Sequence, residues 1–219
     1  LAAMGKPALP ALPDLLDRVA RGPSPEDPRG MEQRFLSSAI FRRMITSAGA
    51  LEGVDRDQLR TAIARGLRNQ DGHARSDISE IYRRLQYDEL QPLLPAVLEA
   101  VVKPAPSGEM FADGVRLNGL KVLAMHHIED GMQACADYLR TQNPWASEHR
   151  TPEILDVLRP YGAHARRILP HLRETAALFA QGEKDFPKHL SELKAKAVRG
   201  AIERIEAASE LPELRRLDP

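Results

Sequence analysis

Several features that often reveal a function are scarce or absent in this 219-residue chain. A single cysteine, Cys135, excludes an internal disulfide framework and a cysteine-rich zinc site. No run of about 18 apolar residues occurs that would span a membrane. The 31 basic side chains are balanced by 31 acidic ones, so the chain lacks the excess positive charge with which nucleic-acid-binding proteins attract phosphates. Because aromatic residues are only 5% of the chain, with one tryptophan, we expect a core of aliphatic side chains.

Strand patterns are also absent, whereas helical patterns recur along the whole chain. No stretch alternates apolar and polar residues over a strand's length, and no Asn-Gly or Asp-Gly turn joins two β-branched runs. Apolar residues recur instead at steps of three and four, which places them on one face of a helix. This pattern predicts an all-α protein, with a composition typical of soluble proteins. The stripes run over Phe35–Ile45, Leu59–Leu67, Leu90–Val102, Leu117–Ile128, Met132–Leu139, Ile168–Phe179 and Leu190–Ile205.

Helix-breaking residues divide these stripes at a regular spacing. They leave about ten helices, and each pair with its loops takes about 44 residues, which lies in the range of HEAT and armadillo repeats. Capping residues predict two helix starts, one at Ser76-Asp77 after a polar loop over 71–77 and one at Thr151 with Pro152 in the first helical position. The loops over 21–30 and 103–114 are longer than a regular repeat needs. An irregular helical bundle is therefore the alternative architecture.

A short pattern recurs within the chain. Gly5 is followed eight residues later by Pro13, and Gly162 is followed at the same distance by Pro170. A weaker copy at Leu94-Pro95 lacks the glycine. Glycine allows the left-handed residue that ends one helix, and proline is tolerated in the first turn of the next. We expect Pro13 and Pro170 to lie at the restart of a helix, or inside it, and to kink it.

Residues 1–13 and 158–170 resemble the helix–turn–helix joint of HEAT-like repeats, members of the armadillo-type superfamily. The resemblance implies an α-α superhelix of about five stacked helix pairs. The stretch from Met110 to Leu172 is also similar to the C-terminal helical part of large bacterial proteins with HEAT-like repeats, a likeness that supplies no activity. We therefore expect one helical-repeat domain over 1–219, with a sub-boundary near 103–114. The opening, Leu1–Gly5, looks like the end of a helix and suggests a fragment of a longer chain, with a processed N-terminus as the alternative.

The candidate metal or catalytic site is the segment His126–Asp130. On a helix, His126 and Glu129 are three residues apart and face one way, and a histidine with a carboxylate is able to bind Zn²⁺ or exchange protons. The spacing His-Glu-x-x-His is absent, and adjacent histidines on a helix point about 100° apart. A polar helix end is the alternative, so we expect no metal or other cofactor, with His126 and Glu129 kept as candidates. Cys135 lies on an apolar stripe and is expected to be a buried thiol.

Candidate partner-binding residues lie in loops and on one basic helix face. Trp145, in a loop between helices, is either an interface anchor or a side chain packed under its own loop. The cluster His164–Arg173 is basic and faces either an anion or acidic partner, or solvent. Lysines from Lys184 to Lys196 alternate with acidic residues, which indicates a solvated surface. The residues predicted to bind a partner are His73, Arg75, Trp145, His149, Arg150, His164 and Arg167.

Three functions fit these observations. The first is a non-catalytic helical-repeat scaffold that binds a protein partner or other domains of its parent chain. The second is an accessory domain of an enzyme, which contributes His126 and nearby acidic residues to a metal or substrate site. The third is a HEAT-like DNA-binding protein, which the balanced charge disfavours. The first residues show no basic segment followed by an apolar stretch, so we expect no signal peptide here, and the compartment stays open.

Overall fold

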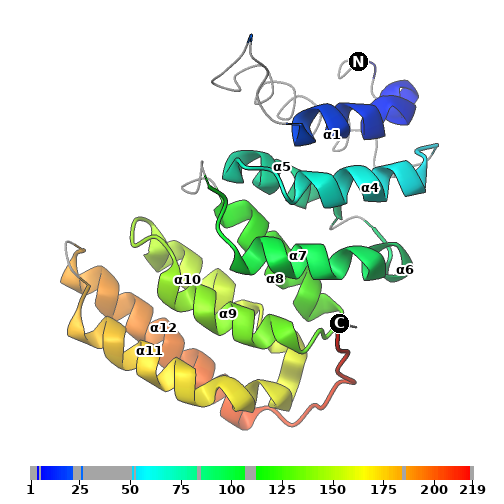
Figure 1. Ribbon diagram of the computed structural model, residues 1–219. Helices are drawn as coiled ribbons and strands as arrows, with labels where there is room; N and C mark the ends of the chain where they lie inside the picture. The colour runs from blue at the N-terminus through cyan, green and yellow to red at the C-terminus, as the bar shows by residue number, and fades with distance from the viewer. Residues whose placement is uncertain are drawn as a thin grey trace. The chain divides into compact units, whose positions relative to one another are not determined.

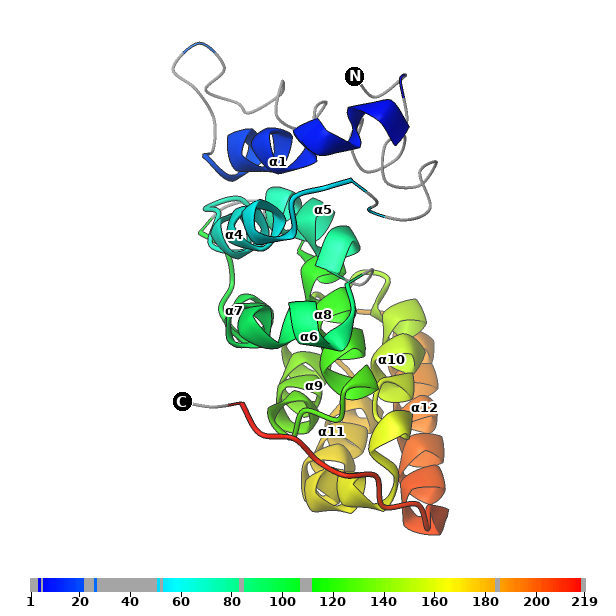
Figure 2. The ribbon, with the colours of Figure 1, turned by 90° about the vertical axis from the view of Figure 1, so that its right-hand side faces the viewer.

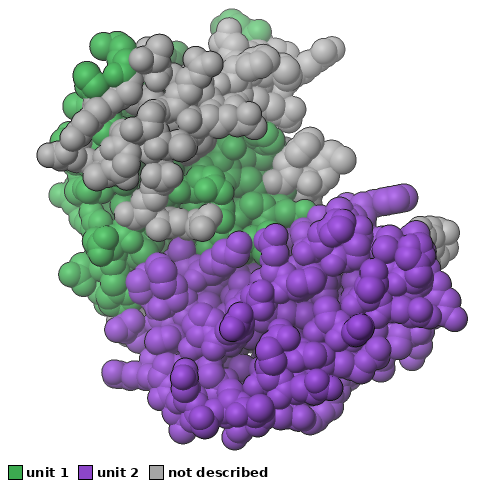
Figure 3. Space-filling model, turned by 180° about the vertical axis from the view of Figure 1, so that it is seen from behind, with its two compact units in different colours: residues 1–119 green, residues 120–219 purple. Residues whose placement is uncertain are grey.

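The computed structural model describes residues 4, 6–21, 26, 51, 53–82, 85–106, 112–183 and 186–217. This described part is all-α, as predicted, and contains no strand (Figure 1). An isolated bridge joins Ile128 and Arg215. The chain divides into two compact units, residues 1–119 and 120–219, which are coloured separately in Figure 3. The helix predicted over Phe35–Ile45 and the residue Gly5 lie outside the described residues. Within them, no helix is long and apolar enough to cross a membrane.

The first unit is a series of short helices joined by turns. Buried leucine and isoleucine side chains hold α1 against α4 and α4 against α5. The buried face of α4 contains Leu59 and Ile63 of the stripe predicted over Leu59–Leu67. Tyr82 closes part of this core, because its buried hydroxyl donates a hydrogen bond to the Val115 carbonyl, 3.3 Å away. In chain order the elements are η2 (Lys6–Ala11), α1 (Leu12–Ala20), α4 (Arg56–Gly66), α5 (Gly72–Tyr82), α6 (Tyr87–Leu90), η4 (Gln91–Leu93), α7 (Leu94–Val102) and the start of α8 (Asp113–Met125).

The second unit is built mainly from four helices in two consecutive pairs. These are α9 (Asp130–Thr141) with α10 (Ser147–Asp156), and α11 (Leu169–Gln181) with α12 (Lys188–Ala207). The 3₁₀ segment η6 (Arg159–Ile168) joins the pairs, and α12 packs against both α10 and α11 (Figure 1). After α12 the chain runs in an extended conformation through residues 208–217, drawn in red in Figure 2.

The three proline positions that recur in the sequence share one local structure. Pro13, Pro95 and Pro170 each occupy the second residue of an α-helix, and a 3₁₀ segment precedes each helix. Proline is accommodated there because the first N–H groups of a helix have no partner within the helix. The prediction that Pro13 and Pro170 lie at a helix restart is confirmed, and at Gly162 the chain takes a positive φ of 55°.

Two predicted helix starts are wrong by several residues. Helix α10 begins at Ser147, so Pro152 lies inside the helix instead of at its start. The burial of Thr151, Ile154 and Leu155 on the inner face offsets the missing proline N–H. Helix α5 begins at Gly72, and the predicted loop over 71–77 is helical after its first residue.

Candidate functional site

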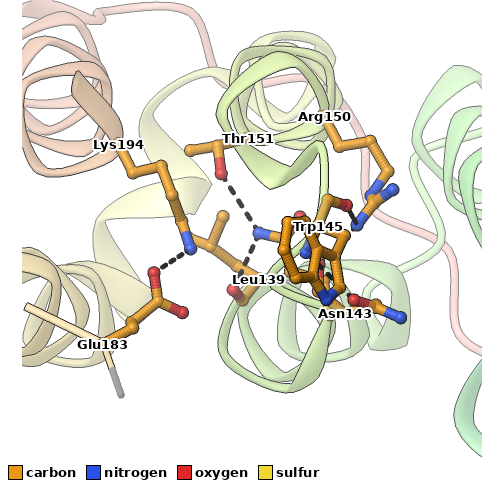
Figure 4. Close-up of polar contacts among 8 residues, drawn as sticks. Leu139, Asn143, Trp145, Arg150, Thr151, Glu183 and Lys194 are labelled. Carbon is orange, nitrogen blue, oxygen red and sulfur yellow. Dashed lines mark hydrogen bonds and ion pairs between the residues drawn. The ribbon is translucent and has the colours of Figure 1, made fainter. Parts of the chain in front are cut away.

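The loop between α9 and α10 presents Trp145 to solvent. The side chain is 73% exposed, so the interpretation that it packs under its own loop is wrong. The loop is nevertheless well held. The backbone N–H of Trp145 donates to Asn143 Oδ1 at 3.0 Å. The Arg150 guanidinium donates to the carbonyls of Asn143 and Trp145, the latter at 2.8 Å (Figure 4). Ala146 takes a left-handed conformation, with φ 57°, and turns the chain into α10. A large apolar side chain is thus fixed on the outside of the molecule.

Polar side chains form the buried base of this loop. Gln142 is almost fully buried, and its amide donates to the Leu139 carbonyl and to Thr151 Oγ1, both at 3.1 Å (Figure 4). The Ser147 N–H donates to the Pro144 carbonyl at 3.0 Å and closes the turn. Buried polar groups that are hydrogen-bonded fix one arrangement of the backbone. The loop geometry therefore depends on α9 and α10 together.

Lys194 lies in the same region, inside the second unit. Its side chain is fully buried, and its ammonium group forms an ion pair with Glu183 (Figure 4). Nζ also lies 3.9 Å from the centroid of the Phe179 ring. Burial lowers the pKa of Lys194, while the hydrogen bond that its ammonium group donates to Glu183 opposes that shift. The prediction that Lys194 belongs to a solvated surface is wrong.

A signal for the burial of Lys194 was present in the sequence. Positions 191, 194, 198, 201 and 205 step by three and four, and extending the apolar stripe Val198–Ile205 back by one turn places Lys194 and Ser191 on its buried face. Leu193, which the predicted stripe places inside, is 54% exposed. Because leucine is usually buried, the sequence places Leu190 and Leu193 on the inner face, and the structure shows the helix rotated from that register.

The roles of His149 and Arg150 differ. His149 is exposed, and its Nε2 lies 3.4 Å from the Glu148 carboxylate. The Arg150 guanidinium donates hydrogen bonds to two backbone carbonyls of the loop. We therefore assign Arg150 the role of positioning Trp145, not of binding a partner. Of the three residues predicted here, the structure leaves Trp145 and His149 facing solvent.

We expect Arg150→Ala to loosen the loop while the helices persist. Trp145 is the chain's one tryptophan, so intrinsic fluorescence reports on this residue alone. The steady-state anisotropy of its emission should fall in the variant, because two carbonyl contacts are lost. Arg140→Ala is the matched control, since Arg140 is an exposed α9 arginine paired with Glu174. Equal anisotropy in all three proteins would contradict the assigned role of Arg150.

His73 and Arg75 lie in the first unit and are engaged within it. Arg75 is 8% exposed, and its guanidinium donates to the Asn69 carbonyl at 2.6 Å and to the Lys103 carbonyl at 3.1 Å. His73 Nδ1 lies 3.5 Å from the Asp77 carboxylate. Arg75 thus ties the start of α5 to the end of α7, and we do not include these two residues in the candidate site.

The segment His126–Asp130 forms the turn between α8 and α9, and the structure brings it together with His164, Arg167 and the extended segment 208–217. The Glu129 carboxylate accepts hydrogen bonds from Arg216, at 2.9 Å, and from Arg167. These guanidinium groups, Arg216 first, hold the pKa of Glu129 below its usual range. Burial, with Arg215 nearby, lowers the pKa of His126.

This environment does not suit a metal ion. Both oxygens of Glu129 are used by arginine, and a cation would have to displace one of these positive groups. Among the described residues, no group of three or more histidine, cysteine or acidic side chains has the arrangement of a metal site. We therefore do not carry the metal hypothesis for His126 and Glu129 further.

The prediction for Cys135 is confirmed. The thiol is buried and lies 3.2 Å from the Ile154 carbonyl, to which it donates. Burial raises its pKa far above the usual value, so it stays protonated and unreactive.

No protein-family model matches this chain, and no curated protein or solved structure matches it. The functional conclusion therefore depends on the chain's own residues.

Proposed function

We propose that this chain is a non-catalytic helical module that binds a protein partner through the Trp145 loop. The observation that carries the proposal is a solvent-exposed tryptophan on a loop held by Arg150 and Asn143. Tryptophan is among the residues that contribute most to binding energy at protein interfaces. The backbone around Trp145 is already ordered. A partner that covers the indole therefore removes little further conformational entropy from the chain on binding.

Other exposed side chains of the second unit add features of an interface. Leu193, near the start of α12, is 54% exposed, and Leu178, near the end of α11, is 42% exposed. His149 and Glu148 place a polar group beside Trp145. Interfaces commonly combine a buried aromatic anchor with a polar, solvent-accessible rim. The complementary partner surface would be an apolar pocket wide enough for an indole ring.

We further propose that the scaffold belongs to the HEAT-like repeat class. What supports this is the shared local structure at Pro13, Pro95 and Pro170, where a 3₁₀ segment leads into an α-helix. Helical repeats supply rigid surfaces without any need for catalytic groups.

The test is a quantitative capture experiment from extracts of the source organism. Proteins retained by the immobilised wild-type chain are compared with those retained by Trp145→Ala and by Val102→Ala. Val102 is an exposed apolar residue of the first unit, 52% exposed, and serves as the matched control. A partner retained by wild type and by Val102→Ala should be reduced at least ten-fold by Trp145→Ala, since hot-spot residues cost about 2 kcal/mol or more when truncated.

The partner should then shift Trp145 emission to shorter wavelength when added to the purified chain, because binding removes the indole from water. Equal capture by wild type and Trp145→Ala, or emission that the captured partner leaves unchanged, would overturn the proposal.

A further inference from the structure

Residues 208–217, here called the docked segment, lie extended along a surface formed by residues 126–129 and 162–167, here called the docking surface (Figure 2). Backbone hydrogen bonds fix both ends. The Ala163 N–H donates to the Glu210 carbonyl at 2.8 Å, the Arg215 N–H donates to the His127 carbonyl at 2.9 Å, and the Glu129 N–H donates to the Arg215 carbonyl at 2.8 Å. This is how a sheet edge recognises an extended peptide, although the docking surface itself consists of turns.

The backbone of the docking surface is shaped around these bonds. Gly162 has φ 55° and ψ −136°, and a methyl group added there would overlap the Glu210 carbonyl oxygen. This position therefore requires glycine. His127 also has a positive φ, 53°, which is uncommon for a residue with a side chain, and its carbonyl accepts the Arg215 N–H. Unusual backbone at both contact points indicates a surface built for an extended chain.

Side chains add recognition of two consecutive arginines. The Arg215 guanidinium donates to the His126 carbonyl at 3.2 Å, just beyond the C-terminus of α8, where the helix dipole favours a cation. The Arg216 guanidinium donates to the Glu129 carboxylate at 2.9 Å. His164 Nε2–H donates to the Pro212 carbonyl at 2.9 Å. The docking surface thus contacts the backbone of Glu210, Pro212 and Arg215 and the side chains of the two arginines.

The docked segment is held mainly by polar contacts at the surface. Leu211 is 69% exposed, and the Arg216 side chain is 84% exposed. Exposed ion pairs contribute little to stability, and elements with few buried apolar contacts open at low free energy. The segment is therefore able to leave and expose an intact docking surface.

We propose that the docking surface is a second binding site, which takes an extended peptide with consecutive arginines from a partner protein, and that residues 208–217 occupy it in cis as a competing ligand. The site goes beyond the proposed function, because it lies near the start of α9, whereas the Trp145 loop follows the end of that helix. Tethering gives the cis segment an effective concentration of about millimolar, so it blocks weak peptides and yields to those that bind more tightly.

The test measures binding of a fluorescently labelled peptide with the sequence of residues 208–217 to the full chain by fluorescence anisotropy. In the variant Arg215→Ala/Arg216→Ala, the chain's own segment binds poorly, so the peptide should bind at least ten-fold more tightly than to wild type. A peptide with alanine at both arginine positions should bind this variant at least ten-fold more weakly than the native peptide. Circular dichroism and thermal unfolding verify that the proteins fold.

Two further substitutions place the binding on the docking surface. Added to the double variant, Glu129→Gln should weaken the binding of the native peptide several-fold, because it removes the carboxylate that pairs with Arg216. The binding of the alanine peptide should not change. Gly162→Ala should abolish binding of both peptides, because its methyl group meets the peptide backbone. If a folded double variant binds neither peptide, or binds both equally, the proposal is wrong.

Discussion

Glu183→Gln is expected to lower the free energy of unfolding by about 2–3 kcal/mol, because it leaves the ammonium group of Lys194 buried without its ion-pair partner. Removing one partner of a buried ion pair typically costs about 3–5 kcal/mol, and the retained amide oxygen of glutamine offsets part of that cost. The Phe179 ring, 3.9 Å from Nζ, does not replace a full negative charge. Urea unfolding followed by circular dichroism measures the effect.

The reciprocal substitution, Lys194→Met, should be much milder. Methionine fills a similar volume with apolar atoms, and Glu183, whose side chain is 20% exposed, is able to turn toward water. We expect a change within about 1 kcal/mol of wild type, since buried ion pairs are often replaced by apolar residues at little cost. If Lys194→Met destabilises the chain as much as Glu183→Gln, the buried charge is not the origin of the effect.

The pH dependence has a definite sign. Burial lowers the pKa of Lys194 in the folded state below 10.5, its ordinary value. Between these two pKa values the unfolded chain binds more protons than the folded chain, so stability rises with pH in that window. Glu183→Gln removes the negative charge that opposes the shift most strongly, leaves the weaker effect of Glu148, and so lowers the pKa of Lys194 further. The loss of stability in this variant should therefore become smaller as the pH rises toward 10.5, and a loss that does not change with pH would contradict the explanation.

Gly131→Ala is the second substitution with a large expected effect. Gly131 is buried at the start of α9, and a methyl group there would overlap the Tyr161 hydroxyl oxygen and lie 2.9 Å from Leu123 Cβ. That hydroxyl is fully buried and donates to the Ile128 carbonyl at 2.9 Å. Overpacking costs about 1–3 kcal/mol, and a broken buried hydrogen bond costs a similar amount. We expect a loss of about 3 kcal/mol, measured by thermal or urea unfolding.

Tyr161→Phe supplies the matched double-mutant test. Alone it should cost about 1–2 kcal/mol, because the Ile128 carbonyl loses its buried donor. Combined with Gly131→Ala it removes the atom that the new methyl group meets, so the double variant should be more stable than Gly131→Ala alone. Additive losses would show that the clash with Tyr161 is not what limits residue 131.

Local structure followed closely from local sequence. Apolar residues at steps of three and four predicted helices such as α9 and α11, and Cys135 inside the α9 stripe is buried as expected. The position of Pro170 at a helix restart was also predictable, because it depends only on backbone sterics within one turn. Errors came where a distant contact outweighed a local preference, as at Thr151, which is buried inside α10 instead of capping it.

The candidate sites depended more on long-range contacts. The sequence identified Trp145 as a residue of interest but left open whether it was covered, because exposure is decided by what packs beside the loop. It also identified His126, Glu129, His164 and Arg167 as separate clusters. That Glu129 and Arg216, 87 positions apart, meet across the docking surface was not visible in any local pattern.

By itself, then, the sequence determined the all-α class, the aliphatic core stripes and the recurring proline joints, since these depend on periodicity and on the conformational limits of single residues. Only the tertiary structure decided that Lys194 is buried, that Trp145 stands in solvent and that residues 208–217 occupy the docking surface. A charged or aromatic side chain takes its environment from the elements packed around it, and those elements come from distant parts of the chain.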